Sequence, residues 1–397
     1  MSDTSIEPHS SMSMRALALC DAGRMELRDV PRPQAGARDV LVRVAAVGLC
    51  GTDIHIFAGH ANYHTDVRGR PVPLNEHPQI LGHEISGVVE DVGSEVGDLR
   101  AGDRVVIDQG LNCVSTRRTP MCEYCATGDS HQCEFYREHG ITGLPGGLAD
   151  YIAVPAVNAV CIDSDIEYAE AALTEPLGCI VHSSDAVAAR SVSARYKINA
   201  EEKERRVRAC LICGAGPAGL LFTQYLRNVL KFDGRLLVSE PNERKRALAE
   251  SFGAEVIDPR AVDLVEAVAE RTNGRRIEYL IEASGSGHSF TQIPGLIRKQ
   301  ATVLLYGHGH AGTDLSVINN VNFLEPTLVL PVGASGGFDA DGRPSVYRYA
   351  LSLISDGHIK VAPFISHRYP SFGEVPVALA SGHRAPDYIK GVLTIKR

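Results

Sequence analysis

The sequence predicts an α/β protein that combines a β-rich, barrel-like domain with a doubly wound parallel sheet covered by helices on both faces. Length is the first reason, because a chain of 397 residues is longer than one that usually folds around a single hydrophobic core. The second is a change of pattern near Glu175, where short strands separated by turns give way to strands alternating with helices. The third is a content of 44% hydrophobic and 22% charged residues, which is typical of globular proteins.

The first third of the chain is rich in Val, Gly and Pro and carries short runs in which apolar and polar residues alternate. We expect strands there at Arg15–Cys20, Val40–Val47, Ile85–Val92 and Arg104–Asp108. Short strands separated by turn residues predict a barrel-like domain over residues 1–176.

The middle of the chain alternates between apolar strands and helices. Strands are expected at Ala209–Cys213, Leu236–Ser239, Glu255–Ile257, Tyr279–Glu282 and Thr302–Tyr306, and helices at Ala218–Leu230, Arg244–Phe252 and Leu264–Arg271. This alternation predicts a parallel sheet over residues 177–336, with the charged interval Ser191–Arg208 as a surface insertion. Residues 337–397 are expected to return to the first domain through a helix at Ser345–Ser355 and a strand at Val392–Ile395.

Charge and hydropathy exclude several classes of partner. The formal net charge is −8 and Lys and Arg do not cluster, so nucleic acid and acidic membrane surfaces are not expected partners. No apolar run approaches the ~20 residues that cross a bilayer, and residues 1–13 lack the apolar centre of a secretion signal. We therefore expect a cytoplasmic protein, in which ten cysteines indicate metal binding rather than disulfides.

A glycine-rich segment, Leu211–Gly219, follows the first strand of the expected parallel sheet and opens a helix. Gly214 permits a tight turn, Gly216 lets the backbone approach a pyrophosphate, and Gly219 lets helix and strand pack closely. The phosphates would lie against the amino end of the helix that Pro217 begins. This G-x-G-x-x-G pattern predicts a dinucleotide site.

Glu240 ends the second strand of the same sheet, about 20 residues after the glycines, where a carboxylate would bind both ribose hydroxyls. A carboxylate there repels a 2′-phosphate, so NAD is favoured over NADP. Arg244 and Lys245 follow closely and keep NADP open as the alternative.

Two segments of the β-rich domain, Gly48–His55 and Gly82-His83-Glu84, carry residues that could bind zinc. The thiolate of Cys50 and the imidazole of His83 are good zinc ligands, and a catalytic zinc needs three protein ligands and one open position. Glu84 or Glu175 could supply the third. Each of these residues taken alone is compatible with a metal-free role, so the prediction depends on the set.

These segments resemble the zinc-containing medium-chain dehydrogenases, especially the sorbitol and threonine dehydrogenase branches, and the resemblance covers Arg15 to Ile395. It implies a GroES-like catalytic domain and a Rossmann nucleotide domain. Cys50 and His83 are implied zinc ligands, with Glu84 ligating directly. The segment Thr174–Leu177 resembles the third ligand segment, so Glu175 would bind through the metal's water or replace it during turnover.

The resemblance also implies roles for side chains around the zinc. Asp53 would orient a ligand histidine. Thr52 would receive the proton of the alcohol and pass it through the nicotinamide ribose to His55. Lys390 would contact the cofactor phosphates, and Gly307 would lie in the loop beside the nicotinamide.

Four cysteines between residues 113 and 133 predict a second, structural zinc. Cys122-x2-Cys125-x7-Cys133 matches the last three ligands of the family's structural lobe, but Thr119 stands where the first is usual. Cys113 is the candidate for the missing thiolate, with His131 as a substitute and a zinc-free lobe as the alternative. Four thiolates leave no open position for a substrate.

The long polar segment between His55 and Gly82 borders the substrate cleft in the family, and it suits a hydroxyl-rich substrate because buried polar groups need partners. The sequence therefore predicts oxidation of a polar secondary alcohol, namely a polyol, sugar or cyclitol, with an amino alcohol such as threonine as the alternative. A metal-free quinone reductase and a nucleic-acid-binding zinc ribbon are alternatives from other classes. A homodimer or homotetramer is expected, with Asn319–Gly333 as the subunit edge.

Overall fold

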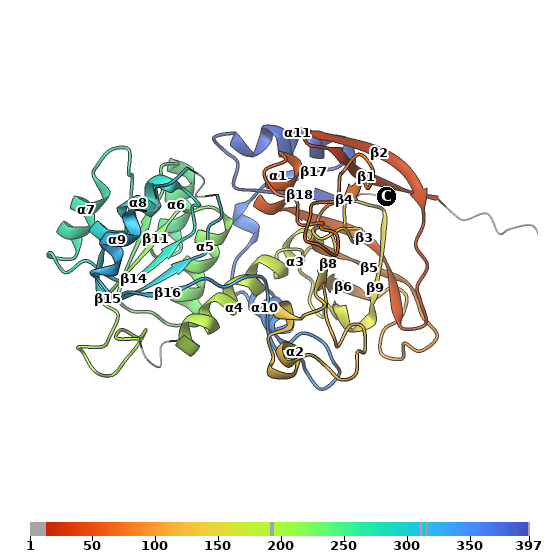
Figure 1. Ribbon diagram of the computed structural model, residues 1–397, viewed down its shortest axis with the longest axis horizontal. Coiled ribbons are helices and arrows are strands. Elements are labelled where there is room, and N and C mark those ends of the chain that lie inside the picture. The colour runs from red at the N-terminus through yellow and green to blue at the C-terminus, as the bar shows by residue number, and fades with distance from the viewer. Residues whose placement is uncertain (1–12, 191–193, 310–311, 315, 396–397) are drawn as a thin grey trace, which may run out of the picture.

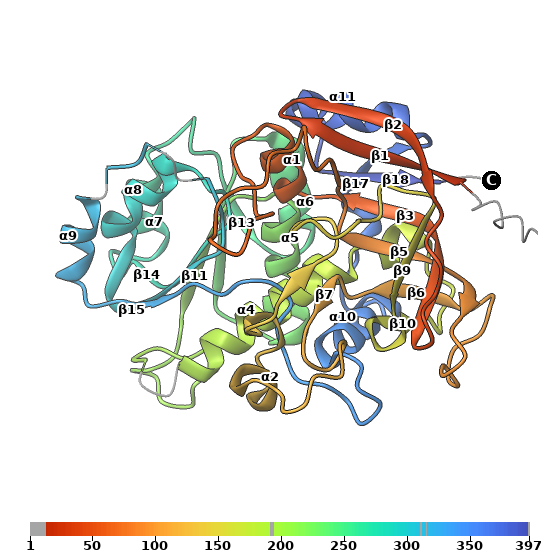
Figure 2. The same cartoon turned by 45° about the vertical axis from the view of Figure 1, so that its right-hand side comes forward.

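The computed structural model describes residues 13–190, 194–309, 312–314 and 316–395, so nearly all of the predicted N-terminal tail lies outside the described residues. Two domains lie side by side, an α/β domain and a β-rich domain (Figure 1). Helices α4 (Thr174–Arg190) and α10 (Ser345–Ser355) pack against each other between them (Figures 1 and 2). Among the described residues, no helix has the length and hydropathy of a membrane span.

The α/β domain is built on a parallel sheet of six strands in the order β13-β12-β11-β14-β15-β16. The chain starts in the middle of the sheet, extends it to one edge, and then crosses back to build the other half. This is the order in which a dinucleotide binds at the carboxyl ends of the central strands. The strands are β11 (Ala209–Cys213), β12 (Arg235–Ser239), β13 (Glu255–Ile257), β14 (Ile277–Glu282), β15 (Ile297–Leu305) and β16 (Thr327–Val329).

Helices cover both faces of this sheet because successive buried side chains along each strand point to opposite faces. Cys210 and Ile212 pack into the cluster that holds α4, α5 and α10, whereas Leu211 and Cys213 pack against α7 and α8. Figure 2 shows α7, α8 and α9 on the side away from the β-rich domain. The helices are α5 (Pro217–Gln224), continued by a π-turn at Tyr225–Val229, α6 (Glu243–Ser251), α7 (Leu264–Arg271), α8 (Gly287–Leu296) and α9 (Val317–Asn322).

The β-rich domain is built on a seven-stranded sheet in the order β10-β6-β5-β3-β18-β17, with β9 also paired to β3. A second sheet, β2-β1-β4, and the short pair β7-β8 complete it. The strands are β1 (Ser13–Asp21), β2 (Arg24–Pro31), β3 (Asp39–Leu49), β4 (Gln79–Ile80), β5 (Glu84–Val92), β6 (Arg104–Ile107), β7 (Gly110–Leu111), β8 (Arg137–Glu138), β9 (Tyr151–Pro155), β10 (Ala159–Cys161), β17 (Ile365–Tyr369) and β18 (Lys390–Thr394).

Short helices fill the corners of the β-rich domain. They are α1 (Gly51–Phe57), α2 (Glu123–Thr127), α3 (Tyr168–Ala171) and α11 (Val375–Ala380), with 3₁₀ turns at Ser130–Gln132, Ala156–Asn158, Ala362–Phe364, Phe372–Glu374 and Gly382–Arg384.

The C-terminal part of the chain lies in the β-rich domain, where β18 pairs antiparallel with β3. Gly391 stands opposite Leu49 in this register, so the last strand runs beside the segment that leads to Cys50. This pairing brings Lys390 to the same end of the sheet as the candidate metal ligands.

Helix α4 and strand β2 are two of the elements that the sequence analysis did not predict. Helix α4 was not expected because its first residues, Thr174 to Leu177, were treated only as a ligand motif. The structure makes α4 a long helix between the domains, and the predicted boundary at 176/177 falls inside it. Strand β2 was also missed, because it is largely exposed and lacks a regular alternation of apolar residues.

Candidate active site and metal centres

Three side chains that could bind a metal converge at the ends of two paired strands of the β-rich domain. Cys50 follows β3, whereas His83 and Glu84 stand at the start of β5. The antiparallel register places Gly48 opposite Glu84, which brings the two segments together. One ligand atom from each of Cys50, His83 and Glu84 lies within 4.8 Å of the others. The three side chains therefore share one small volume.

The Asp53 carboxylate joins the two segments. Its Oδ2 accepts a hydrogen bond from the backbone N–H of Cys50 at 2.9 Å, and its Oδ1 accepts one from Gly82 at 3.1 Å. Oδ1 also lies 3.6 Å from Nδ1 of His83. Burial alone would raise the pKa of Asp53, but the His83 charge and these backbone N–H groups outweigh burial and lower that pKa. An ionised Asp53 thus fixes the relative positions of Cys50 and His83.

Glu84 is fully buried and forms an ion pair with Lys390, whose Nζ lies 2.6 Å from Oε1. Burial alone would lower the pKa of Lys390, but the Glu84 carboxylate outweighs burial and raises that pKa. The other carboxylate oxygen, Oε2, is buried and has no hydrogen-bond partner within the described part of the chain. It lies over Gly48, where an added Cβ would come within 1.8 Å of it. A metal ion beside Cys50 would supply the partner that this oxygen lacks.

The donor set at this site fits zinc. A thiolate sulfur, an imidazole nitrogen and a carboxylate oxygen are the ligand types that zinc prefers, and three of them leave a fourth position for a substrate. Burial alone would lower the pKa of His83, but the negative charges of Asp53 and Cys50 outweigh burial and raise it well above its ordinary value. The site therefore favours a positive charge, which a metal ion would supply in place of the proton.

Glu175 lies in the first turn of α4 and is not part of the group around Cys50. Burial raises the pKa of Glu175 to about 7. Its Oε1 accepts hydrogen bonds from Nε2 of Gln109 at 3.2 Å and from the thiol of Cys179 at 3.4 Å. The Tyr347 hydroxyl donates to Oε1 of Gln109, which turns the amide nitrogen of Gln109 toward Glu175. Glu175 is thus held by Cys179 of its own helix and by Gln109, which Tyr347 of α10 positions.

The side chains predicted to move a proton lie on α1. Thr52 is next to the candidate metal group, with its Oγ1 3.7 Å from Sγ of Cys50. His55 reaches the α/β domain, since an added Cβ at Gly309 would lie 3.8 Å from its ring. Gly307 begins the same loop after β15 and packs tightly against the loop that follows β14. Burial, followed by the charges of neighbouring histidines, lowers the pKa of His55.

The glycine-rich loop joins β11 to α5 at the carboxyl end of β11. Gly214 has a φ of +97°, a conformation that other residues rarely adopt. An added Cβ at Gly219 would lie 1.9 Å from the carbonyl oxygen of Gly214, so the close approach of helix and loop requires glycine. Gly216 faces open space, and Pro217 begins the helix after it. The amino end of α5 is therefore accessible to a phosphate group.

Glu240 lies at the end of β12, next to the glycine-rich loop. Its Oε2 accepts a hydrogen bond from the backbone N–H of Ala215 at 2.7 Å, and its Oε1 accepts one from Asn242 at 2.8 Å. Each carboxylate oxygen retains a lone pair for a further donor. The Glu240 carboxylate is thus fixed next to the loop that would bind the phosphates, within reach of the ribose that adjoins them.

The four cysteines near residue 120 form a second candidate metal group. Their sulfur atoms all lie within 4.8 Å of one another, and all four side chains are buried. The Cys113 and Cys122 sulfurs lie 3.7 Å and 3.8 Å from that of Cys133. A tetrahedral zinc with bonds of about 2.3 Å to sulfur needs edges of about 3.8 Å. The spacing fits zinc and includes Cys113, the member that the sequence left open.

Backbone N–H groups support negative charge on these sulfurs. Cys122 donates to the sulfur of Cys113 at 3.4 Å, Cys125 to that of Cys122 at 3.5 Å, and Phe135 to that of Cys133 at 3.4 Å. The N–H of Cys125 lowers the pKa of the Cys122 thiol to about 6. His131, the predicted substitute ligand, instead lies 3.7 Å from Asp108.

Comparison with known proteins identifies the family. Residues 36–164 match the alcohol dehydrogenase GroES-like domain, and residues 217–355 match the zinc-binding dehydrogenase family. The L-threonine 3-dehydrogenase of Pyrococcus furiosus is 31% identical to this chain over 87% of this chain and 88% of its own. This chain belongs to the zinc-dependent, medium-chain alcohol dehydrogenases.

Two further relatives support this assignment. The sorbitol dehydrogenase of Arabidopsis thaliana is 27% identical over 90% of this dehydrogenase and 89% of its own chain. A zinc-binding dehydrogenase from Sinorhizobium meliloti 1021, solved with NADP, is 27% identical, with a TM-score of 0.75 over 96% of this chain and 99% of its own. The predicted GroES-like and Rossmann domains and the predicted enzyme class are therefore confirmed, and a zinc ribbon that binds nucleic acid is not supported.

One predicted contact of this dehydrogenase stays a prediction. Lys390 was expected to contact the cofactor phosphates, and in the structure its side chain is buried and its Nζ donates a hydrogen bond to Oε1 of Glu84. The hydrogen bonds of Gly391 and Tyr388 hold the strand around it in the β-rich domain. An ion pair with the Glu84 carboxylate stabilises the buried charge of Lys390. Sequence alone did not indicate that these two residues meet.

Two residues of the active site were missed by the sequence reasoning. Gln109 and Tyr347 are 238 residues apart, and each resembles an ordinary core or turn position. Gln109 follows β6, and Tyr347 is a fully buried residue of α10. Only the packing of α10 against the β-rich domain brings them together, so no local pattern could identify them.

The substitution Lys390→Met is expected to destabilise the protein by about 3 kcal/mol, because it leaves the Glu84 carboxylate buried without its cation. The measurement is the free energy of unfolding in urea. Lys360→Met, at an exposed lysine, serves as the control and should change stability little. Adding Glu84→Gln to Lys390→Met should recover part of the loss. A Lys390→Met protein as stable as the parent would contradict the ion pair.

Proposed function

We propose that this dehydrogenase oxidises a polar secondary alcohol, namely a polyol, sugar or cyclitol, to the ketone with NAD, or catalyses the reverse reduction. The observation that carries the proposal is the convergence of Cys50, His83 and Glu84 in a domain that adjoins the glycine-rich loop. A ligand set of one thiolate, one imidazole and one carboxylate, with Glu175 nearby, gives the site more oxygen donors than a site of cysteines and histidine. Such a site suits a substrate with several hydroxyl groups.

Cys50, His83 and Glu84 would hold the catalytic zinc, and Asp53 would orient His83. Zinc held by these residues would act as a Lewis acid that makes the hydroxyl group of a bound alcohol easier to deprotonate. Glu175, whose pKa burial raises to about 7, would act beside this group, where it can hold a proton or accept a hydrogen bond. Gln109 would position it.

The proton would leave by way of Thr52 and His55. Thr52 lies beside Cys50, and His55 lies beside Gly309 at the boundary of the two domains. Burial, followed by the charges of neighbouring histidines, lowers the pKa of His55 below its ordinary value, so the ring releases a proton readily at physiological pH.

The cofactor would bind at the amino end of α5, with its pyrophosphate against Gly216 and its ribose on Glu240. Gly307 would lie beside the nicotinamide. The carboxylate of Glu240 supports NAD as the favoured cofactor, whereas the Sinorhizobium relative binds NADP. The four-cysteine group would hold a second zinc with a structural role.

A threonine-type amino alcohol is the second candidate substrate. The first relatives in sequence are L-threonine 3-dehydrogenases at 31–33% identity, which is higher than the 27% of the sorbitol dehydrogenase. An amino acid substrate needs partners for a carboxylate and an ammonium group, and the polar segment between His55 and Gly82 carries both basic and acidic residues. Substrate testing must therefore include it.

We also propose a cytoplasmic homo-oligomer. β16 is the last strand on one edge of the parallel sheet, and an unpaired edge strand is a template for pairing with a second copy. The segment that contains it exposes large apolar side chains, namely Ile318, Phe323, Leu328, Leu330 and Val332. A dimer that pairs the two β16 strands would cover them.

The purified protein should reduce NAD fastest with polyols, sugars or cyclitols, and should hold two zinc ions per chain. Cys50→Ser should lower kcat by at least about a hundred-fold and remove one zinc, because the thiolate is a ligand. Cys113→Ser should instead remove the other zinc and lower stability. Cys161→Ser, at a partly buried cysteine outside both groups, is the matched control.

Three results would count against the proposal. Best turnover with threonine would favour the second candidate, and best turnover with long aliphatic alcohols would overturn the polar substrate. Full activity of Cys50→Ser, or of protein freed of zinc, would favour a metal-free reductase.

The substitution Glu240→Gln should lower the ratio of kcat/KM for NAD to that for NADP by at least about ten-fold, because it removes the charge that repels a 2′-phosphate. The amide oxygen of Gln can still accept one of the backbone hydrogen bonds, so the loop should keep its shape. Glu243→Gln, at an exposed position one turn away, is the control. An unchanged ratio would refute the role of Glu240 in cofactor choice.

A further inference from the structure

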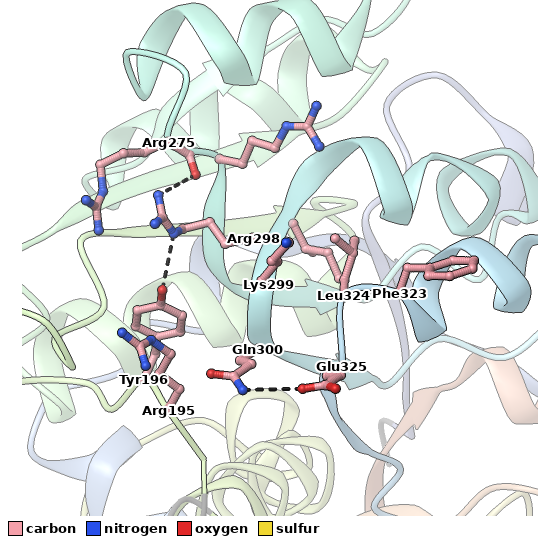
Figure 3. Close-up of a pocket in the computed structure, with 11 residues that line it drawn as sticks. Arg195, Tyr196, Arg275, Arg298, Lys299, Gln300, Phe323, Leu324 and Glu325 are labelled. Atoms are coloured by element: carbon pink, nitrogen blue, oxygen red, sulfur yellow. Dashed lines mark hydrogen bonds between the residues drawn. The ribbon is translucent and has the colours of Figure 1, made fainter.

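A hollow in the α/β domain lies outside every site described so far. It has a volume of about 690 Å³ and opens at the amino ends of β14 and β15, between the insertion at residues 195–196 and the segment before β16. Figure 3 draws the side chains that line it, which come from these four segments. The dehydrogenase chemistry uses none of them.

The hollow is strongly basic although the protein is acidic overall. Five cationic side chains line it, and Glu325 is the only carboxylate among its lining residues: the cations are Arg195, Arg275, Arg276, Arg298 and Lys299. The whole chain has a formal net charge of −8, so this concentration of positive charge is local. Clefts lined by one sign of charge raise the local concentration of ligands of the opposite sign.

Buried contacts fix two of the arginines in place. Glu278, which is fully buried, lies 3.1 Å from Nη2 of Arg275 and 3.9 Å from Nε of Arg298. Arg298 also donates to the Tyr196 hydroxyl at 3.2 Å and to the carbonyl oxygen of Arg275 at 2.9 Å (Figure 3). One carboxylate thus holds two guanidinium groups and neutralises only one of their two charges.

The hollow retains unused hydrogen-bond donors. Nε of Arg275 is buried and has no partner in the described ranges, although a buried donor of this kind normally has one. Arg276 and Lys299 are exposed, and within the residues that the structure describes neither forms an ion pair. The charges of Arg276 and Lys299 are therefore available to a ligand.

The position of the hollow separates it from the cofactor site. In a parallel sheet all strands point the same way, and the glycine-rich loop follows the carboxyl end of β11. The hollow lies at the opposite ends of the strands, where β14 begins at Ile277 and β15 at Ile297. A molecule bound there cannot touch the nicotinamide or the candidate zinc ligands, so it would be a second ligand.

We propose that this hollow binds a small molecule with two or more anionic groups, either a phosphorylated or a polycarboxylate metabolite. Guanidinium groups form paired hydrogen bonds with phosphate and carboxylate oxygens alike. The concave shape suits a small molecule, and the net negative charge of the chain opposes binding of a nucleic acid. Arg275 and Arg298 form the base of the site, and Arg276 and Lys299 form its rim.

The test is titration calorimetry on the full-length protein saturated with NAD, so that the glycine-rich loop is occupied. Inorganic pyrophosphate represents the phosphorylated class and citrate the polycarboxylate class. One of them should bind at one site per chain and weaken as salt increases. The double substitution R276Q/K299Q should weaken that binding by at least about ten-fold, because each removes a charged hydrogen bond.

Two controls make the result decisive. K203Q/K360Q removes the same charge from exposed lysines outside the hollow and should leave binding unchanged. Light scattering on R276Q/K299Q should give the mass of the parent. The proposal is overturned if neither anion binds, or if R276Q/K299Q binds as tightly as the parent. It is also overturned if that variant changes the oligomeric state, since a second copy would then cover the hollow.

Discussion

The charge buried at the ends of β3, β5 and β18 is the constraint on which the rest of the site depends. Cys50, Asp53 and Glu84 bring three acidic groups together there, and within the described residues Lys390 pairs with Glu84 while His83 lies 3.6 Å from Asp53. Buried charges are costly unless they are paired, so the arrangement is incomplete without further positive charge. A divalent cation satisfies this need, and it explains why a carboxylate oxygen lies buried over Gly48 without a donor.

The path of the chain brings the partners of these buried groups together. The C-terminal segment crosses back from the α/β domain and pairs β18 with β3, which places Lys390 beside Glu84. Helix α10 returns in the same way and places Tyr347 beside Gln109, which in turn donates a hydrogen bond to Glu175. Elements that follow the nucleotide domain in sequence therefore complete the metal site of the first domain. The two domains share one hydrophobic cluster around α4 and α10, which keeps these contacts in register.

The sequence predicted those parts of the protein that local pattern determines. Ala209–Cys213, Leu264–Arg271 and Ser345–Ser355 have the predicted bounds because periodicity and flanking turns define them. The glycines at 214 and 219 were predicted because their backbone geometry admits no other residue. Local pattern could not predict contacts between distant segments, such as the contact of Lys390 with Glu84 and that of Gln109 with Tyr347. The membership of Cys113 in the thiol group also had to come from the folded structure.

The two ends of the parallel sheet differ in what their chemistry permits. At the carboxyl ends, the helix α5 presents an open amino terminus beside glycines, and the Glu240 carboxylate is fixed by the backbone of the same loop. At the amino ends, the chain has no such glycine loop, and anion recognition would depend on side-chain charge instead. Side chains there can vary without disturbing hydride transfer, because the sheet separates them from the reacting atoms. A fold that keeps its catalytic residues at one end of the sheet can therefore acquire a second ligand at the other end.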